Sequence, residues 1–302
     1  MARNPNPPDI APHDEGVGEL LSRVAARVAR VTGIEAIVLG GSRARGTADA
    51  HSDIDLGLYY DSRRPFRIED LERAARELDD RHASGLVTPF GAWGPGVNGG
   101  GWLKLGGIHV DFLYRDLAAV RLAIDECRAG DLKTIYQLGH PSGFHNQIYA
   151  GEINCCQILF DRRRQVARLK RLVARYPEKL RHAIARKHLF DAAFELAIAD
   201  KPALRGDVMY VTGCLFRAAS FMTLVAYAMN RRWLINEKGA LAGLSTMPSR
   251  PRAMEATLAR VLANPGRTAD QLERSIGAMK SLCGRFRALA ARGGIALIDS
   301  GF

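Results

Sequence analysis

The pattern of apolar and polar residues changes character near the middle of the chain. In the first half, short apolar runs alternate with glycine-rich or polar turns, as in residues 35–42, 53–60 and 102–114. Runs of this length bounded by turn residues predict β-strands. Between them, apolar residues recur with helical spacing over 15–31, 68–83 and 116–128. The first half therefore predicts helices packed on a sheet.

Beyond Asp161 the pattern becomes helical. Apolar residues recur at three- and four-residue spacing over 162–176, 178–200, 203–230, 251–263 and 269–291, and a further strand is expected over 153–161. We predict an α/β (α+β) domain with a mixed sheet over 15–160, followed by an all-α helical bundle over 161–302. Residues 1–14 are polar and proline-rich, which predicts a disordered tail.

A pair of carboxylates follows a glycine-serine turn. Asp53 and Asp55 are separated by one residue, so in a strand they lie on the same face. The backbone amides of a glycine turn can approach phosphate oxygens closely, and the Ser42 hydroxyl adds a donor. One of Arg43 and Arg45 is expected to add charge there, with solvated arginines at a helix start as the alternative. Two carboxylates repel each other unless a cation lies between them, and Mg²⁺ is bound by carboxylates together with substrate phosphates. The stretch predicts a metal-nucleotide site at Gly41, Ser42, Asp53 and Asp55.

A third carboxylate fits the same pattern at Asp111. Alternation in the run 108–113 places Ile108, Val110 and Phe112 on one face and Asp111 on the other. An aspartate among apolar residues is costly to bury without a partner, and three carboxylates can hold two metal ions. The alternatives are a solvated edge strand for the pair and a surface aspartate for Asp111.

The ordered set Gly41-Ser42, Asp53-Ile54-Asp55 and Asp111 resembles the DNA polymerase β type nucleotidyltransferase superfamily. GSRARGTA followed by SDIDL is similar to small bacterial nucleotidyltransferases, including aminoglycoside- and lincosamide-modifying enzymes, and the resemblance covers residues 34–114 well. It implies transfer of a nucleoside monophosphate, AMP from ATP in the commonest case, to a hydroxyl of an antibiotic or metabolite. It also implies two Mg²⁺ ions, one held by all three aspartates and one by Asp53 and Asp55.

The resemblance extends to the helical half at one position. In related antibiotic-modifying enzymes a lysine of the helical domain reaches the triphosphate, and Lys238 in its Asn-Glu-Lys-Gly-Ala setting looks like its counterpart. A surface lysine is the alternative. Related enzymes can be dimers that share sites, so a homodimer is an open expectation.

The general base and the substrate contacts are left open by the sequence. Asp111, Glu152 and Asp207 are candidates for the base, and His145 is a candidate substrate contact in the loop expected over 138–152. Asp207 opens a narrow polar stripe on an apolar helix, for which an internal network with Arg217 is the alternative. The glycine-rich stretch 91–101 is expected to be a wide hairpin, with a mobile flap as the alternative.

Charge is distributed unevenly over the chain, whose net charge is +11. Residues 1–160 hold 17 basic and 21 acidic side chains, whereas residues 161–302 hold 26 and 11. The basic half could attract triphosphate, RNA or a nucleotide-bearing molecule, or could simply be a solvated surface. No RNA-recognition or KH signature accompanies it, so nucleic acid is not the favoured partner.

Other features of the composition narrow the class of protein to which the chain can belong. No apolar run reaches the roughly 20 residues that span a bilayer, and the polar start lacks a signal-peptide core, so a cytoplasmic location is expected. The five cysteines lack a C-x-x-C spacing, so neither a disulfide nor a zinc site is expected.

Three functional classes follow from these observations. The first is a small-molecule nucleotidyltransferase, favoured because the chain is compact and carries a substantial second domain. The second is transfer to a macromolecule, either AMP to a protein or nucleotides to RNA. The third is a non-catalytic nucleotide-sensing module, against which the presence of all three carboxylates argues.

Overall fold

The protein is described by a computed structural model over residues 15–49, 51–299 and 301. The chain divides into two compact units. The sheet unit comprises Met1–Ile124, Ile135–Gly139 and Tyr149–Ala174, and the helical unit comprises Asp125–Thr134, His140–Ile148 and Arg175–Phe302. The expected boundary after residue 160 stays a prediction, and the tail expected over 1–14 lies outside the described residues. The predicted fold class, a mixed sheet with helices followed by a helical region, is confirmed.

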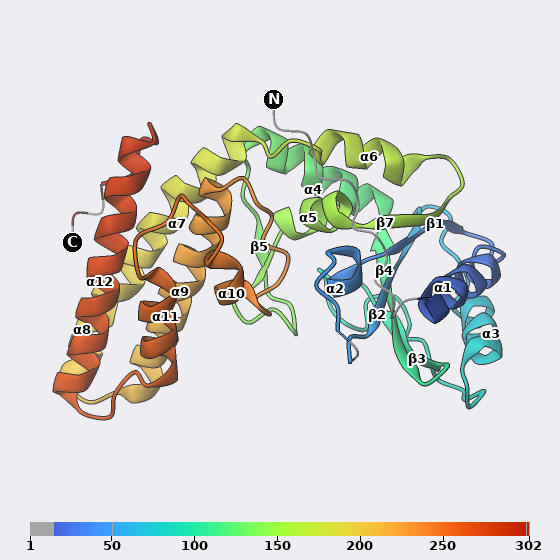
Figure 1. The fold of residues 1–302 in the computed structure, drawn as a ribbon, viewed down its shortest axis with the longest axis horizontal. Helices are drawn as coiled ribbons and strands as arrows, with labels where there is room; N and C mark the ends of the chain where they lie inside the picture. Colours follow the sequence, from blue (N-terminus) through green and yellow to red (C-terminus); the bar gives the residue numbers. More distant parts are fainter. Residues whose placement is uncertain (1–14, 50, 300, 302) are drawn as a thin grey trace. The chain divides into compact units, whose positions relative to one another are not determined.

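A five-stranded sheet in the order β3-β4-β2-β1-β7 forms the centre of the sheet unit (Figure 1). Strands β2 and β4 run parallel, while the other neighbouring pairs are antiparallel, so the sheet is mixed. The strands are β1 (Ile34–Leu39), β2 (Ile54–Tyr60), β3 (Gly100–Leu105), β4 (Ile108–Asp116) and β7 (Gln157–Asp161). Two very short strands, β5 (Thr134–Ile135) and β6 (Phe144–His145), lie in connecting segments.

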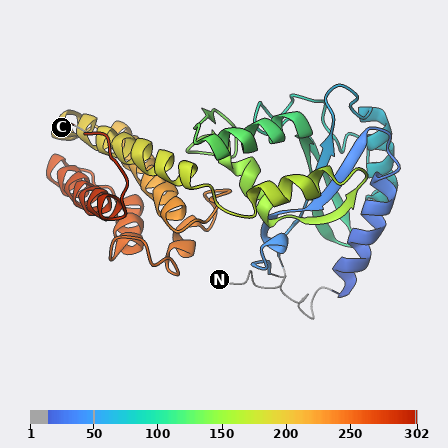
Figure 2. The same ribbon diagram turned by 90° about the horizontal axis from the view of Figure 1, so that it is seen from above.

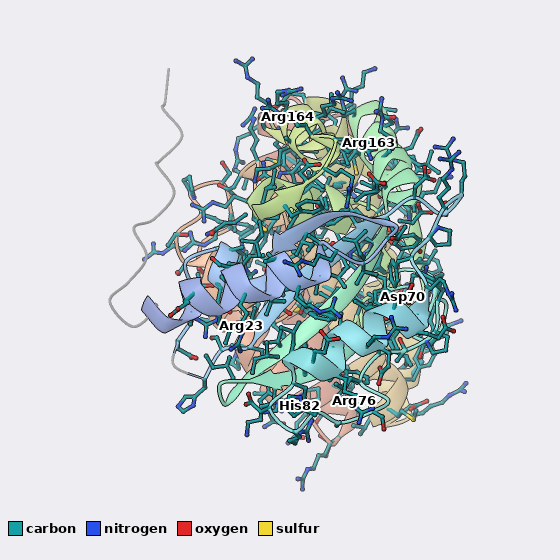
Figure 3. The ribbon with its side chains drawn as sticks, turned by 90° about the vertical axis from the view of Figure 1, so that its right-hand side faces the viewer. Arg23, Asp70, Arg76, His82, Arg163 and Arg164 are labelled. Atoms are coloured by element: carbon teal, nitrogen blue, oxygen red, sulfur yellow. The ribbon has the colours of Figure 1, made fainter. Side chains whose placement is uncertain are left out.

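One face of the sheet packs against helices α1 (Glu15–Val28) and α3 (Ile68–Leu78). Every second residue of the central strands, including Ile54, Leu56 and Phe112, is buried in this core. The two helices lie side by side, and charged residues such as Arg23 on α1 and Arg76 on α3 stay on their exposed surfaces (Figure 3). Because side chains alternate along a strand, the residues between the core positions face the opposite side.

The remaining helices of the first half differ in part from the prediction. Helix α4 (Leu117–Ala129) lies where the sequence predicts it, and α2 (Gly41–Ala44) is a single turn after β1. The strand predicted over 153–161 is wrong in its first part, because helix α5 (Gln147–Cys155) continues to Cys155 and β7 begins at Gln157. A short apolar run does not distinguish a strand from a buried helix. Helix α6 (Gln165–Val173) follows β7.

The helical unit is built around the packed pair α7 (Glu178–Ile198) and α9 (Val208–Met229). Helix α12 (Ala269–Arg292) lies along α7 (Figure 2) and begins with a capping box formed by Thr268 and Gln271. The helix predicted over 203–230 is interrupted, because α8 (Asp200–Leu204) ends before Gly206, whose φ of +68° breaks the helical path. Shorter helices α10 (Ala240–Leu244) and α11 (Met254–Ala263) complete the unit.

Within the described part of the chain, α9 alone is long and apolar enough to cross a membrane. In its most apolar window, 56% of the residues are buried inside the protein. A core helix of a soluble protein meets the same criteria of length and composition, so α9 by itself indicates little about membranes.

Candidate active site

The glycine-serine turn packs directly against Asp55. The Gly40 amide donates a hydrogen bond of 2.8 Å to the Asp55 carbonyl, which closes the turn between β1 and β2. Gly41 has a φ of +60°, and a Cβ atom at this position would overlap Oδ2 of Asp55. Only glycine combines this backbone conformation with so close an approach. The turn and the carboxylate therefore form one local unit.

Asp55 and Asp111 lie side by side on the parallel strands β2 and β4. Their Cα atoms are register partners, so both side chains project from the same face, opposite to Ile54 and Val110, which are fully buried in the core. Neighbouring strands are about 4.8 Å apart. Both aspartates are half-buried. The parallel pairing thus brings together two carboxylates that the sequence could only place on separate strands.

Asp53 lies just outside the strand in which it was predicted. Strand β2 begins at Ile54, and Asp53 is exposed in the preceding turn. Arg43 anchors this turn, because its Nη2 atom donates a hydrogen bond of 2.8 Å to the Ser52 carbonyl. Asp53 thus lies one residue before β2, so the alternation of the strand does not by itself fix the direction of its side chain.

The donor set suits a hard cation. Two neighbouring half-buried carboxylates, with Asp53 beside them in sequence, match the ligand preference of Mg²⁺, which is bound by one or two carboxylates together with substrate phosphates. No three His, Cys, Asp or Glu side chains of the described residues are gathered into a group that could hold a metal ion by themselves. The residues present fit a cation that completes its coordination with substrate oxygens.

Ser42 and Arg45 lie on the short helix α2 and its end. Within the described part of the chain the Ser42 hydroxyl makes no hydrogen bond, whereas its carbonyl accepts from the amides of Arg45 and Thr47 at 3.1 and 3.0 Å. Arg45 is exposed, and its Nε atom donates to the Gly41 carbonyl at 3.2 Å. The turn that packs on Asp55 through Gly41 thus also carries a hydroxyl and an exposed guanidinium.

A buried ion pair of Arg115 and Glu152 is a feature that the sequence did not predict. Arg115 is 3% exposed, and its Nε and Nη2 atoms donate to the two Glu152 oxygens at 2.8 and 2.7 Å. Burial alone would lower the pKa of Arg115, but the charge and hydrogen bonds of Glu152 raise it above its ordinary value. Because both oxygens of Glu152 bind the guanidinium, this geometry does not favour Glu152 as a general base.

Two stacked tryptophans lie next to Asp111. Trp102 is the antiparallel register partner of Asp111, so its side chain lies on the same face, and it is 59% exposed. Trp93, from the glycine-rich stretch, stacks on it with 4.6 Å between ring centroids and 30° between the planes. Neither tryptophan was predicted from the sequence as a site residue. The signal that could have identified Trp102 is its alternation with the apolar Leu103 in the expected strand, which places Trp102 on the face opposite to the core.

Three predicted site residues belong to the helical unit. Lys238 is exposed, and its amide donates to Asn236 Oδ1 at 2.8 Å. Asp207 caps α9 by accepting a hydrogen bond of 3.0 Å from the Tyr210 amide. The Arg217 guanidinium pairs with Glu195 of α7, so the alternative network with Asp207 is not what forms.

His145, the third predicted site residue of the helical unit, lies in a buried cluster. Its Nδ1 atom is 2.8 Å from the Thr134 hydroxyl, and its ring meets that of His188 at a centroid distance of 5.6 Å. Burial, with smaller contributions from His188, His140 and Lys187, lowers the pKa of His145 to about 3, against a small opposing effect of Asp191. Burial also lowers the pKa of His188, although the hydrogen bond to Asp191 opposes this shift. His145 is therefore neutral near pH 7.

Comparison with known proteins identifies a nucleotidyltransferase domain in the first half of the chain. Residues 19–89 match the family model of the nucleotidyltransferase domain, a stretch that contains Gly41, Ser42, Asp53 and Asp55 and ends before Asp111. No curated protein matches the chain. Among solved structures, a nucleotidyltransferase-like protein from Exiguobacterium sibiricum is similar, with 9% identity, a TM-score of 0.47, and coverage of 92% of this chain and 78% of that one.

Proposed function

We propose that this chain, whose residues 19–89 match the model of the nucleotidyltransferase domain, transfers a nucleoside monophosphate to a hydroxyl of a small molecule. ATP is the proposed donor, an antibiotic or metabolite is the proposed acceptor, and pyrophosphate is the second product. The observation that carries the proposal is the register of Asp55 with Asp111, beside a glycine-serine turn that packs on Asp55.

In this proposal the carboxylates hold Mg²⁺. Asp53, Asp55 and Asp111 would bind one ion, and Asp53 and Asp55 a second. When bound, the metal lowers the pKa of the acceptor hydroxyl and neutralises charge on the triphosphate. Gly41 and Ser42 would bind the outer phosphates through the turn amides and the hydroxyl.

The remaining steps fall to the residues of the chain. The acceptor oxygen attacks the α-phosphorus, the bond from the α-phosphorus to the bridging oxygen breaks, and pyrophosphate leaves with that electron pair. Asp111 is the proposed acceptor of the hydroxyl proton, by its position beside Asp55. Glu152 holds Arg115 with both oxygens, and Asp207 caps a helix of the other unit, so neither is assigned this role. Arg45 would add positive charge at the phosphates.

Lys238 enters the proposal through the family resemblance alone. It would offset charge on the leaving pyrophosphate, and its exposure is compatible with such a contact. A cytoplasmic location and a homodimer are further parts of the proposal. The strongly basic segment 161–302 keeps a second candidate function open, namely transfer of AMP to a protein or of nucleotides to RNA.

Release of pyrophosphate tests the proposed function. The protein is incubated with α-labelled nucleoside triphosphates, Mg²⁺ and a panel of hydroxyl-bearing acceptors, and labelled products are separated from free nucleotide. Asp55→Asn and Asp111→Asn are expected to reduce turnover by at least about a thousandfold, because each removes a metal ligand and a transition-state contact.

Asp61→Asn is the matched control. Asp61 directly follows β2 and pairs with the exposed Arg63, away from the turn, so its loss should leave turnover unchanged. Wild-type turnover in either Asp55→Asn or Asp111→Asn would contradict the proposal. A product on RNA whose formation falls steeply with salt would instead favour the second candidate function.

A further inference from the structure

The exposed Trp102 ring on the face that carries Asp111 calls for a physical explanation. A tryptophan that is 59% exposed offers a large flat apolar surface, on which a ring of a ligand can stack. Its register with Asp111 places the ring one strand away from Asp111 and two strands away from Asp55, and neighbouring strand axes are about 4.8 Å apart.

Hydrogen bonds from Gln137 and Tyr149 hold the backbone of the segment that carries Trp93. Gln137 is 3% exposed, and its Nε2 atom donates to the Trp93 carbonyl at 2.7 Å. Its Oε1 atom accepts from the amides of Gly96 and Val97 at 2.9 and 3.1 Å. The Tyr149 hydroxyl donates to the Gly96 carbonyl at 2.7 Å. These contacts pin the glycine-rich stretch, so the geometry favours the hairpin interpretation over a mobile flap.

A glycine in β3 makes room for the second ring. A Cβ atom on Gly100 would overlap the Phe112 carbonyl oxygen and the ring of Trp93. Any larger residue at position 100 would push Trp93 away from the strand and from Trp102. The ring pair is therefore built into the hairpin in advance of any ligand.

The strand order indicates which substrate the tryptophans face. The sheet runs β3-β4-β2-β1, so Asp111 on β4 lies between Asp55 on β2 and Trp102 on β3. The glycine-serine turn that would bind phosphates joins β1 to β2. A ring stacked on Trp102 is thus on the far side of Asp111 from the phosphate turn, where the acceptor hydroxyl would approach.

We propose that Trp102, backed by Trp93, is the platform on which a ring of the acceptor stacks, and that the acceptor is accordingly a cyclic compound. The flat faces of sugar and aromatic rings share the chemistry that an indole face binds. This inference rests on the proposed function for the identity of the second substrate. It assigns a specificity-determining role to Trp102, which orients the acceptor without taking part in bond formation.

Binding of cyclic probes tests the platform without requiring turnover. In a Trp233→Phe background the fluorescence reports only Trp93 and Trp102, because the chain has three tryptophans. Methyl α-glucopyranoside and benzyl alcohol serve as the sugar and aromatic probes, and glucitol serves as the acyclic polyol. Saturable quenching by one cyclic probe but not by glucitol is expected, and the responding probe identifies the ring class. Equal responses to all three, or no response, would overturn the proposal.

Substitution of Trp102 supplies the second readout. By nuclear magnetic resonance titration, Trp102→Ala is expected to weaken binding of the responding probe by about tenfold, with partial recovery in Trp102→Phe. The affinity for Mg·ATP, measured by calorimetry, should not change. Tyr136→Ala is the matched control, since Tyr136 is 82% exposed in the same unit but has no place in the ring pair.

The outcomes separate the platform from the proposed function. Loss of Mg·ATP affinity in Trp102→Ala would assign the ring pair to the nucleobase and overturn the inference. Unchanged affinity for cyclic probes in Trp102→Ala would overturn it as well. Probe binding that depends on Trp102, combined with no pyrophosphate release for any acceptor, would support the platform and count against the proposed function alone.

Discussion

Gly41 and Asp55 are packed so closely that a Cβ atom on Gly41 would overlap Oδ2 of Asp55. The glycine therefore sets the position of a carboxylate as well as the path of the turn. This coupling makes the turn and the proposed metal ligand sensitive to the same substitution.

Gly41→Ala is expected to reduce turnover by at least about a hundredfold and to lower the free energy of unfolding by about 1–3 kcal/mol. The added methyl group is strained at a φ of +60° and displaces the Asp55 carboxylate. Gly107→Ala is the control, because Gly107 also has a positive φ, +80°, but nothing lies within 4 Å of its Cβ position. Steady-state kinetics and urea unfolding measure both effects. Equal losses of activity in the two variants would show that backbone strain, not the contact with Asp55, is responsible.

Glu152→Gln is expected to destabilise the protein by about 3 kcal/mol. The substitution leaves the Arg115 guanidinium, which is 3% exposed, without its compensating charge. Urea unfolding of the variant, beside Asp61→Asn as an exposed ion-pair control, measures the difference. Turnover is measured under conditions in which the variant stays folded. The geometry predicts that activity persists, whereas loss of turnover would identify Glu152 as the general base.

Acidification is expected to destabilise the helical unit through His145. Its pKa is about 3 in the folded protein against 6.5 for an unperturbed histidine, so the unfolded chain binds a proton more readily. The stabilising contribution is complete above pH 6.5 and is lost progressively as the pH falls toward 3. Between pH 7 and pH 5 this amounts to about 2 kcal/mol.

The variant His145→Gln tests this dependence. Unfolding free energies at pH 7, 6 and 5 should fall less steeply in the variant than in the wild type, whatever its stability at pH 7. His51→Gln, at an exposed histidine, is the control and should retain the wild-type slope. A wild-type slope in His145→Gln would contradict the assignment.

Lys238→Ala is expected to weaken binding of Mg·ATP by about tenfold, because one charge contact to the triphosphate is lost. Isothermal titration calorimetry measures the affinity, and Lys201→Ala on α8 removes an exposed lysine of the same unit as the control. Unchanged affinity for Mg·ATP in Lys238→Ala would show that Lys238 is a surface lysine without a contact to the triphosphate.

Local patterns predicted most of the elements but not their exact limits. Helix α7 closely matches the predicted helix over 178–200, since its periodicity extends over many turns and Pro177 precedes it. The strand predicted from residue 153 is wrong up to Cys155, because apolar content alone does not choose between a strand and a buried helix. Gly206 is present in the sequence, but the pattern does not show that a helix ends there, because single glycines are tolerated inside helices.

The sequence by itself determined that Asp55 faces away from Ile54 and that a glycine-serine turn stands beside it, because alternation and turn chemistry act over a few neighbouring residues. Only the tertiary structure decided that Asp111 pairs with Asp55, that Trp102 flanks Asp111, and that Arg115 takes both oxygens of Glu152. These relationships join segments that are distant along the chain. Their register is set by packing of the buried face of the sheet, which no local pattern specifies.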